Sequence, residues 1–127
     1  MRIVLADHQA RVRFALRAWL EQQPGLTVVG EAGDATEALS QVAACQPQVL
    51  LLDWALRGSR LDLLSALHTA CPELRVIVLS ARPEMRCGIL TAGADAFVSK
   101  TDPPERVLEA IRDVNSLRPN AKANHAY

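Results

Sequence analysis

The chain has 127 residues, half of them hydrophobic, and its fourteen basic and fourteen acidic residues leave no formal net charge. This length suits one domain with a core of ordinary size, and the composition argues against disorder and against a long basic face for nucleic acid. No apolar stretch is long enough to span a bilayer, and the N-terminus lacks a signal peptide. We therefore expect a cytoplasmic protein without direct membrane or nucleic-acid contact, whose three scattered cysteines are free thiols.

Short β-rich runs alternate with amphipathic stretches of helical length along the whole chain. The expected strands are Ile3–Ala6, Leu26–Gly30, Val49–Leu52, Val76–Leu79 and Ala96–Val98. The expected helices are Ala10–Gln22, Thr36–Ala44, Leu61–Ala70, Glu84–Thr91 and Glu105–Ser116. Because parallel strands need crossover connections, this alternation predicts an α/β fold, a doubly wound parallel sheet with helices on both faces.

Two helix starts and one chain end carry signals of their own. Asp34 to Glu37 form a capping box, and Asp102 precedes two prolines that suit the first turn of a helix. Residues 1–116 are expected to form the domain. Residues 117–127 are polar and lack periodicity, which predicts a flexible tail or the start of a linker.

Polar side chains stand at the ends of four of the expected strands. Asp7 follows the first strand, Asp53 the third, Ser80 the fourth and Lys100 the fifth. In an open α/β sheet, ligands bind at the carboxyl ends of the strands. Each residue alone has an ordinary explanation as a helix cap or a solvated side chain, but four at one edge indicate a shared site.

These residue types suit the transfer of a phosphoryl group to a carboxylate. Asp7 and Asp53 offer the hard oxygen ligands that Mg²⁺ prefers, and the cation would relieve the charge on the accepting carboxylate. Lys100 and Ser80 would supply a positive charge and a hydroxyl donor to the phosphoryl oxygens. Since such transfer relies on positioning and charge neutralisation, this set could act without a general base.

Six motifs in order, RIVLAD, VVGEAGDATEAL, VLLLD, VIVLSA, AGADAFVSK and PPERVLEAIR, resemble the receiver domain of two-component response regulators. VVGEA and GADAFVSKTDPPERVLEAIR are similar in style to receivers of the LuxR/NarL type, which precede a helix-turn-helix DNA-binding domain. The resemblance implies a flavodoxin-like, CheY-like (βα)5 domain with a five-stranded parallel sheet in the order 2-1-3-4-5. It also implies an output DNA-binding domain that these residues do not contain.

The resemblance further implies that a sensor histidine kinase phosphorylates Asp53. The other matched positions are the acid and the backbone carbonyl that hold Mg²⁺ together with Asp53, the phosphate-binding lysine, the switch hydroxyl and the switch aromatic: Asp7, Ala55, Lys100, Ser80 and Phe97. A homodimer through helical faces is expected by analogy only.

His8 departs from the family pattern, because it stands where the second acid of the metal-binding pair is usual. An imidazole is a poor ligand for Mg²⁺ and a better one for zinc, nickel, copper or iron, so metal affinity should fall or metal preference should shift. Alternatively, a protonated His8 would partly replace the cation beside Asp7 and Asp53. In a third reading, the His8 side chain turns outward into solvent.

The loop after Asp53 also departs from the family, since Arg57 stands where a proline is common and the stretch is shorter.

The sequence supports two hypotheses of different class for the function. The leading hypothesis is a phosphorylation switch in which Ser80 and Phe97 rearrange the face made by the fourth helix, fifth strand and fifth helix, to control transcription. The alternative is an atypical receiver that binds partners independently of phosphorylation. Beyond self-phosphorylation and self-dephosphorylation, we expect no enzyme, because nucleotide-binding glycine motifs are missing.

Overall fold

The computed structural model describes residues 1–116, so the tail expected at 117–127 lies outside the described residues. Its strands are β1 (Arg2–Ala6), β2 (Thr27–Ala32), β3 (Val49–Asp53), β4 (Arg75–Ser80) and β5 (Ala96–Ser99). Its helices are α1 (Ala10–Glu21), α2 (Ala35–Cys45), α3 (Leu61–Ala70), the short 3-10 helix η1 (Pro83–Met85), α4 (Arg86–Thr91) and α5 (Glu105–Asn115). All five predicted strands are confirmed, with ends that differ by one or two residues.

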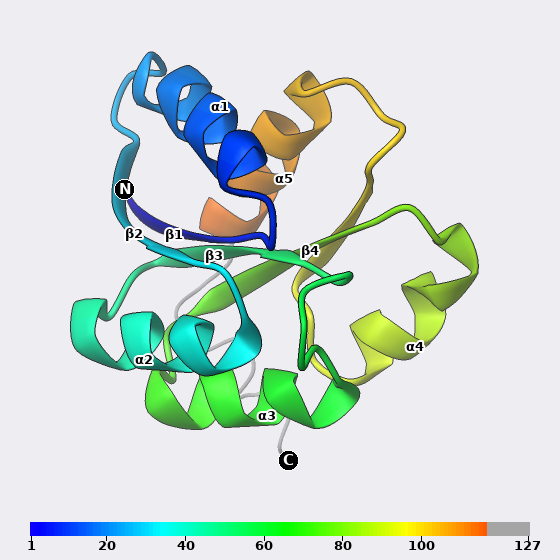
Figure 1. Cartoon of the computed structure of the whole chain (residues 1–127). Helices are drawn as coiled ribbons and strands as arrows, with labels where there is room; N and C mark the ends of the chain where they lie inside the picture. The colour runs from blue at the N-terminus through cyan, green and yellow to red at the C-terminus, as the bar shows by residue number, and fades with distance from the viewer. Residues whose placement is uncertain (117–127) are drawn as a thin grey trace.

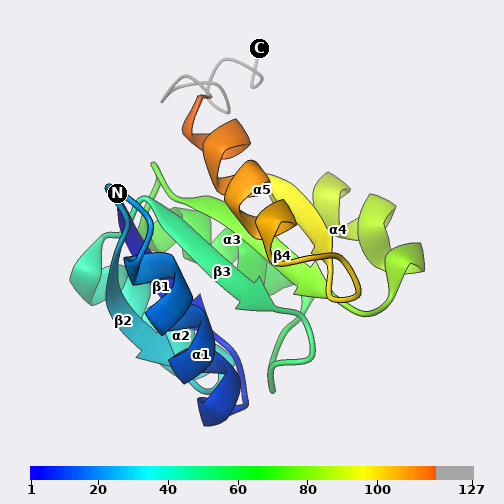
Figure 2. The ribbon, with the colours of Figure 1, turned by 90° about the horizontal axis from the view of Figure 1, so that it is seen from above.

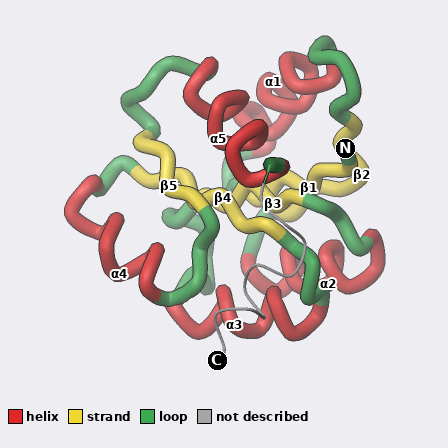
Figure 3. The backbone as a smooth tube through the Cα atoms, turned by 180° about the vertical axis from the view of Figure 1, so that it is seen from behind, coloured by secondary structure: helices red, strands yellow, loops and turns green. Residues whose placement is uncertain are grey.

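The strands form one parallel sheet in the order β2-β1-β3-β4-β5, as the resemblance implied. Figure 3 shows the strands side by side across the centre of the molecule. The sheet order places the carboxyl ends of β1 and β3 next to each other, because the chain returns from β2 to the far side of β1. β2 ends two residues beyond its expected end, and its pairing with β1 has a register shift between Ile3 and Val4.

Helices cover both faces of the sheet, with α1 and α5 on one face and α2, α3 and α4 on the other (Figures 1 and 2). Successive side chains of β1 alternate between these faces, so Ile3 and Leu5 pack with α1 and α5 while Val4 packs on the other side. β3 lies at the middle of the sheet, and all its residues are buried. Burial on both faces explains why VLLL reads as one continuous apolar run.

Helix starts agree with the sequence at one position and differ at another. The side chain of Asp34 accepts a hydrogen bond from the Glu37 amide at 2.8 Å, and Glu37 accepts one from the Gly33 amide at 3.1 Å. The predicted cap at Asp102 is wrong, since α5 begins after Pro104 and no side chain caps it. The Arg106 and Val107 amides donate instead to the carbonyls of Pro103 and Pro104, each at 3.0 Å, so backbone groups satisfy two donors of the first turn.

Candidate functional site

The carboxyl ends of β1, β3 and β5 bring Asp7, Asp53 and Lys100 together, as predicted. Asp53 is the last residue of β3, and its side chain is fully buried. The Lys100 Nζ lies 2.6 Å from Oδ1 of Asp53 and 3.8 Å from Oδ2 of Asp7. Two carboxylates from neighbouring strands therefore share one ammonium group.

His8 lies against the other oxygens of the same two carboxylates. Its Nδ1 is 3.0 Å from Oδ2 of Asp53 and 3.7 Å from Oδ1 of Asp7. The outward orientation of His8 is therefore wrong: one ring nitrogen faces the acids, although the side chain as a whole is 44% exposed. Lys100 and His8 thus flank the carboxylate pair from two sides.

The pKa values of the two carboxyl groups shift in opposite directions. Burial raises the pKa of Asp7, and the charge of Asp53 raises it further against the opposing effects of the Gln9 amide, Lys100 and His8. Burial also acts to raise the pKa of Asp53, but the hydrogen bond from Lys100 and the amide of Ala55 outweigh it, so this pKa is lowered. Asp53 is therefore held as an anion, the form that a nucleophile requires.

Backbone groups fix the orientation of both carboxylates. The Gln9 amide donates to Oδ1 of Asp7 at 2.8 Å, and the Ala55 amide donates to Oδ1 of Asp53 at 3.0 Å. Each bond closes a short turn directly after a strand, so strand and loop together set the carboxylate position.

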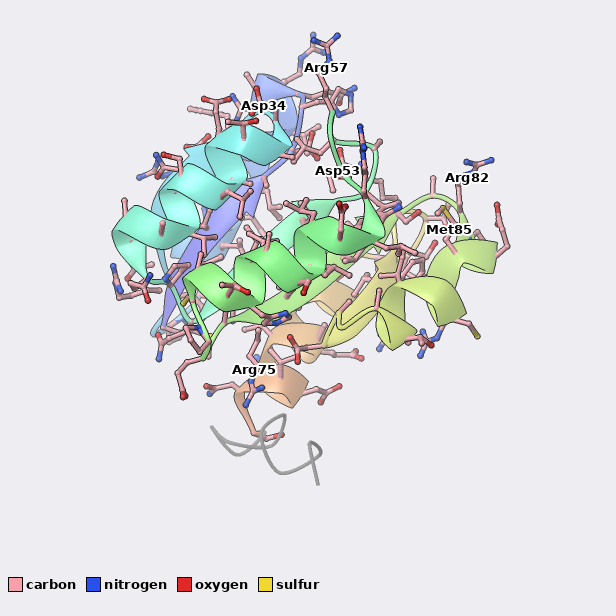
Figure 4. All side chains as sticks on the ribbon, turned by 90° about the horizontal axis from the view of Figure 1, so that it is seen from below. Asp34, Asp53, Arg57, Arg75, Arg82 and Met85 are labelled. Atoms are coloured by element: carbon pink, nitrogen blue, oxygen red, sulfur yellow. The ribbon has the colours of Figure 1, made fainter. Side chains whose placement is uncertain are left out.

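The loop after β3 packs against the start of α2. Gly58 has a φ of +86°, and a Cβ built there would lie 2.9 Å from the Cβ of Ala35. The Arg57 carbonyl accepts from the Ala35 amide at 2.9 Å. Figure 4 shows the Arg57 side chain at the outer end of the loop, away from Asp53. This loop therefore needs a glycine at 58.

The remaining predicted residues lie at the same edge or behind it. Ser80 is buried at the end of β4, and its Oγ accepts a hydrogen bond from the Arg82 amide at 3.0 Å. Phe97 is 7% exposed and packs in the core on the side of α3 and α4. Ala55 is exposed beside Asp53.

Comparison with known proteins agrees with this geometry, since residues 3–112 match the model of the response regulator receiver domain. The chain belongs to the response regulator receiver family. It is 30% identical over 131 residues to the transcriptional regulatory protein LiaR of Bacillus subtilis, covering 99% of this chain and 61% of LiaR. It is 34% identical over 113 residues to the nitrate/nitrite response regulator NarP of Escherichia coli, covering 87% of this chain and 53% of NarP.

Solved structures show the same receiver fold. RcsB of Salmonella enterica serovar Typhimurium, bound to promoter rprA with the phosphomimetic BeF₃⁻, has a TM-score of 0.82 and 25% identity, covering 91% of this chain and 99% of that one. The receiver spans 53–61% of the length of LiaR and NarP. These relatives are LuxR/NarL-type regulators of transcription, which does not favour a phosphorylation-independent binding module.

Receiver domains are generally not enzymes. No helix within residues 1–116 is long and apolar enough to cross a membrane.

Receiver domains bind Mg²⁺ through an acidic pocket, and this receiver offers Asp7, His8 and Asp53 in that place. One ligand atom from each of the three lies within 4.8 Å of the others. Two carboxylates at this spacing fit a divalent cation. The third group is a nitrogen ligand in place of the usual oxygen.

One residue of the site escaped the sequence analysis. Arg13 of α1 donates through Nη1 to the Asp7 carbonyl at 2.5 Å and pairs through Nε with Glu31 at 3.2 Å. Its side chain is only 19% exposed. The sequence feature that could have indicated this contact is Glu31 near the end of β2, a strand that lies beside α1.

Proposed function

We propose that this receiver accepts a phosphoryl group on Asp53 from a sensor histidine kinase and thereby switches an interaction face that controls transcription. One observation carries the proposal: a fully buried, anionic Asp53 at the end of β3 has Lys100 at 2.6 Å and Asp7 beside it. An apolar residue would pack better at this buried position, so packing does not explain an Asp there.

The chain's own residues supply most of the chemistry. A carboxylate oxygen of Asp53 attacks the phosphorus atom, the bond from phosphorus to the donor nitrogen breaks, and that nitrogen keeps the electron pair. Lys100 lies where it balances the charge of the incoming oxygens. A divalent cation held by Asp7, Asp53 and the Ala55 carbonyl would supply further charge neutralisation.

Ser80 and Phe97 are proposed to pass the signal on. The Ser80 hydroxyl accepts a hydrogen bond from the Arg82 amide, and its own hydrogen can rotate toward a phosphoryl group on Asp53. Its movement would shift the segment leading into η1 and α4, against which Phe97 packs. Phosphorylation would in this way favour one of two arrangements of α4, β5 and α5.

The direct test is the intact mass of the protein after incubation with acetyl phosphate, with Mg²⁺, Mn²⁺ or EDTA. We expect a single phosphoryl adduct that requires the cation and is lost in Asp53→Asn. Asp62→Asn, which changes an exposed acid of α3, is the matched control and should label normally. No adduct under any cation would reject the proposal.

A groove beside the site supports docking of the kinase. It has a volume of about 610 Å³ and runs between α1 and the segment from Val98 to Val107, with Val12 and Lys100 in its lining. Val12 is 38% exposed there. Val12→Arg should slow transfer from a phosphorylated kinase domain but leave labelling by acetyl phosphate unchanged, because only the protein donor needs the groove. Slowing of both reactions would contradict this assignment. A homodimer and a cytoplasmic location stay predictions.

A further inference from the structure

We propose that His8 is a metal ligand through Nδ1 and makes this receiver select first-row transition ions, such as Mn²⁺, Co²⁺ or Ni²⁺, over Mg²⁺. The inference deepens the proposed function by naming the class of cation, and it rests on that function only for what the bound ion is used for. The binding itself follows from the geometry of Asp7, His8 and Asp53.

The distances in the cluster are close to those between ligands of one ion. His8 Nδ1 lies 3.0 Å from Oδ2 of Asp53 and 3.7 Å from Oδ1 of Asp7. Two atoms that each bind an ion at about 2.1 Å, roughly 90–110° apart, lie about 3.0–3.5 Å from each other. The side chain therefore needs little movement to exchange its contact with Asp53 for a bond to a metal.

Lys100 and His8 divide the carboxylate oxygens between them. Lys100 faces Oδ1 of Asp53 and Oδ2 of Asp7, whereas His8 faces the other oxygen of each acid. An ion on the His8 side would thus leave the bonds to Lys100 in place. The imidazole is 44% exposed, so ions can enter from solvent with their remaining water ligands.

The ligand types then decide which ion is preferred. Mg²⁺ prefers oxygen ligands and exchanges its water reluctantly, so a nitrogen ligand adds little to its binding affinity. Imidazole binds Mn²⁺ weakly and Co²⁺ and Ni²⁺ more strongly, in the order of their general affinities. The affinities of oxygen ligands for these ions follow the same order with a smaller spread. The change in metal affinity when His8 is removed is therefore the decisive quantity.

The test is direct binding of Mg²⁺, Mn²⁺, Co²⁺ and Ni²⁺ by calorimetry and by the fluorescence of Trp54, which follows Asp53 and is half-buried. We expect the wild type to bind Ni²⁺ at least about tenfold tighter than Mg²⁺, and His8→Ala to lose about tenfold or more of the Ni²⁺ affinity with little change for Mg²⁺. His8→Asp should bind Mg²⁺ more tightly than the wild type. The control is His125→Ala, which removes another imidazole and should change nothing.

A second measurement identifies the ligand itself. Co²⁺ should shift the imidazole proton signals of His8 in the NMR spectrum of the wild type, because the paramagnetic ion is bonded to the ring. Unchanged Ni²⁺ affinity in His8→Ala would overturn the proposal. So would a rise in Mn²⁺ affinity in that variant, since it would mean that His8 stands in for the cation. No phosphodonor is present, so failure here is distinguishable from failure of Asp53 to accept phosphate.

Discussion

Two clusters of acidic and basic side chains, each built around buried carboxylates, lie at opposite ends of the same sheet, and their compositions differ. At the carboxyl ends, Asp7 and Asp53 share Lys100 and His8. At the amino ends, a single acid, Asp95, accepts from the Val76 amide at 2.7 Å and has two basic partners on β4 and α3. Figure 4 places Asp53 and Arg75, one of those partners, far apart across the sheet.

The two clusters differ in how fully the acids are paired with basic groups and hydrogen-bond donors. Asp95 has Arg75 at 3.8 Å and His68 at 3.6 Å in addition to its backbone donor, and its side chain is 4% exposed. In the other cluster, burial and then the charge of Asp53 raise the pKa of Asp7, whereas hydrogen bonds from Lys100 and the Ala55 amide lower the pKa of Asp53. A cluster with one acid and two bases serves stability, whereas a crowded pair of acids keeps oxygens ready for a ligand at some cost in stability.

The largest expected effect comes from removing the ammonium group of the first cluster. Lys100→Met should slow labelling by acetyl phosphate about 100-fold, because one preorganised charge is lost where the phosphoryl oxygens develop negative charge. Quench-flow or timed mass spectrometry gives the rate. Arg75→Met, which removes a cation from the second cluster, should leave the labelling rate of the folded protein unchanged. An equal loss of rate in both variants would abolish the distinction between the clusters.

The sequence predicted the cluster at the carboxyl ends of the strands much better than the one at the amino ends. Asp7, Asp53 and Lys100 follow strands directly, and parallel strands bring their carboxyl ends to one edge whatever the details of packing. In the other cluster, Nε2 of His68 on α3 lies 3.6 Å from Oδ2 of Asp95. That contact depends on how α3 lies against β5, which no local pattern encodes.

The orientation of His8 likewise could not be read from the sequence. Its place after Asp7 left an inward and an outward rotamer equally open, and the choice depends on Oδ2 of Asp53, 45 residues away. Sheet order decides it, because β3 pairs directly with β1. Residue types at strand ends were thus predictable, while contacts between side chains of distant segments were not.

A smaller effect is expected from the second cluster. Asp95→Ala should lower the free energy of unfolding by about 2 kcal/mol, because the Val76 amide loses its acceptor and the buried Arg75 loses a counter-charge. Urea denaturation followed by far-UV circular dichroism measures this. Asp113→Ala, at an exposed position of α5, should change the free energy by less than about 0.5 kcal/mol. Equal midpoints for the two variants would show that the amino-end cluster contributes nothing to stability.

The smallest effect, of opposite sign, is expected from relieving the crowded acids. Asp7→Asn keeps an Oδ1 acceptor for the Gln9 amide and should raise the free energy of unfolding by about 1 kcal/mol at neutral pH, measured in EDTA. Burial first, and then the charge of Asp53, raises the pKa of Asp7 above its ordinary value of 3.8. Below that value Asp7 is protonated in both the folded and the unfolded chain, so wild type and variant should be about equally stable.

As pH rises from 3.8 to the raised pKa, the unfolded wild type loses the Asp7 proton before the folded chain does, so this residue makes the wild type progressively less stable. The advantage of Asp7→Asn should therefore grow through this window and stay constant above it. Urea titrations at a series of pH values would show the profile, with Asp62→Asn as the exposed control whose difference from wild type stays flat. An advantage independent of pH, or a variant less stable than the wild type at neutral pH, would mean that the two acids are not in conflict. The carboxyl-end cluster would then be as well satisfied as the one around Asp95.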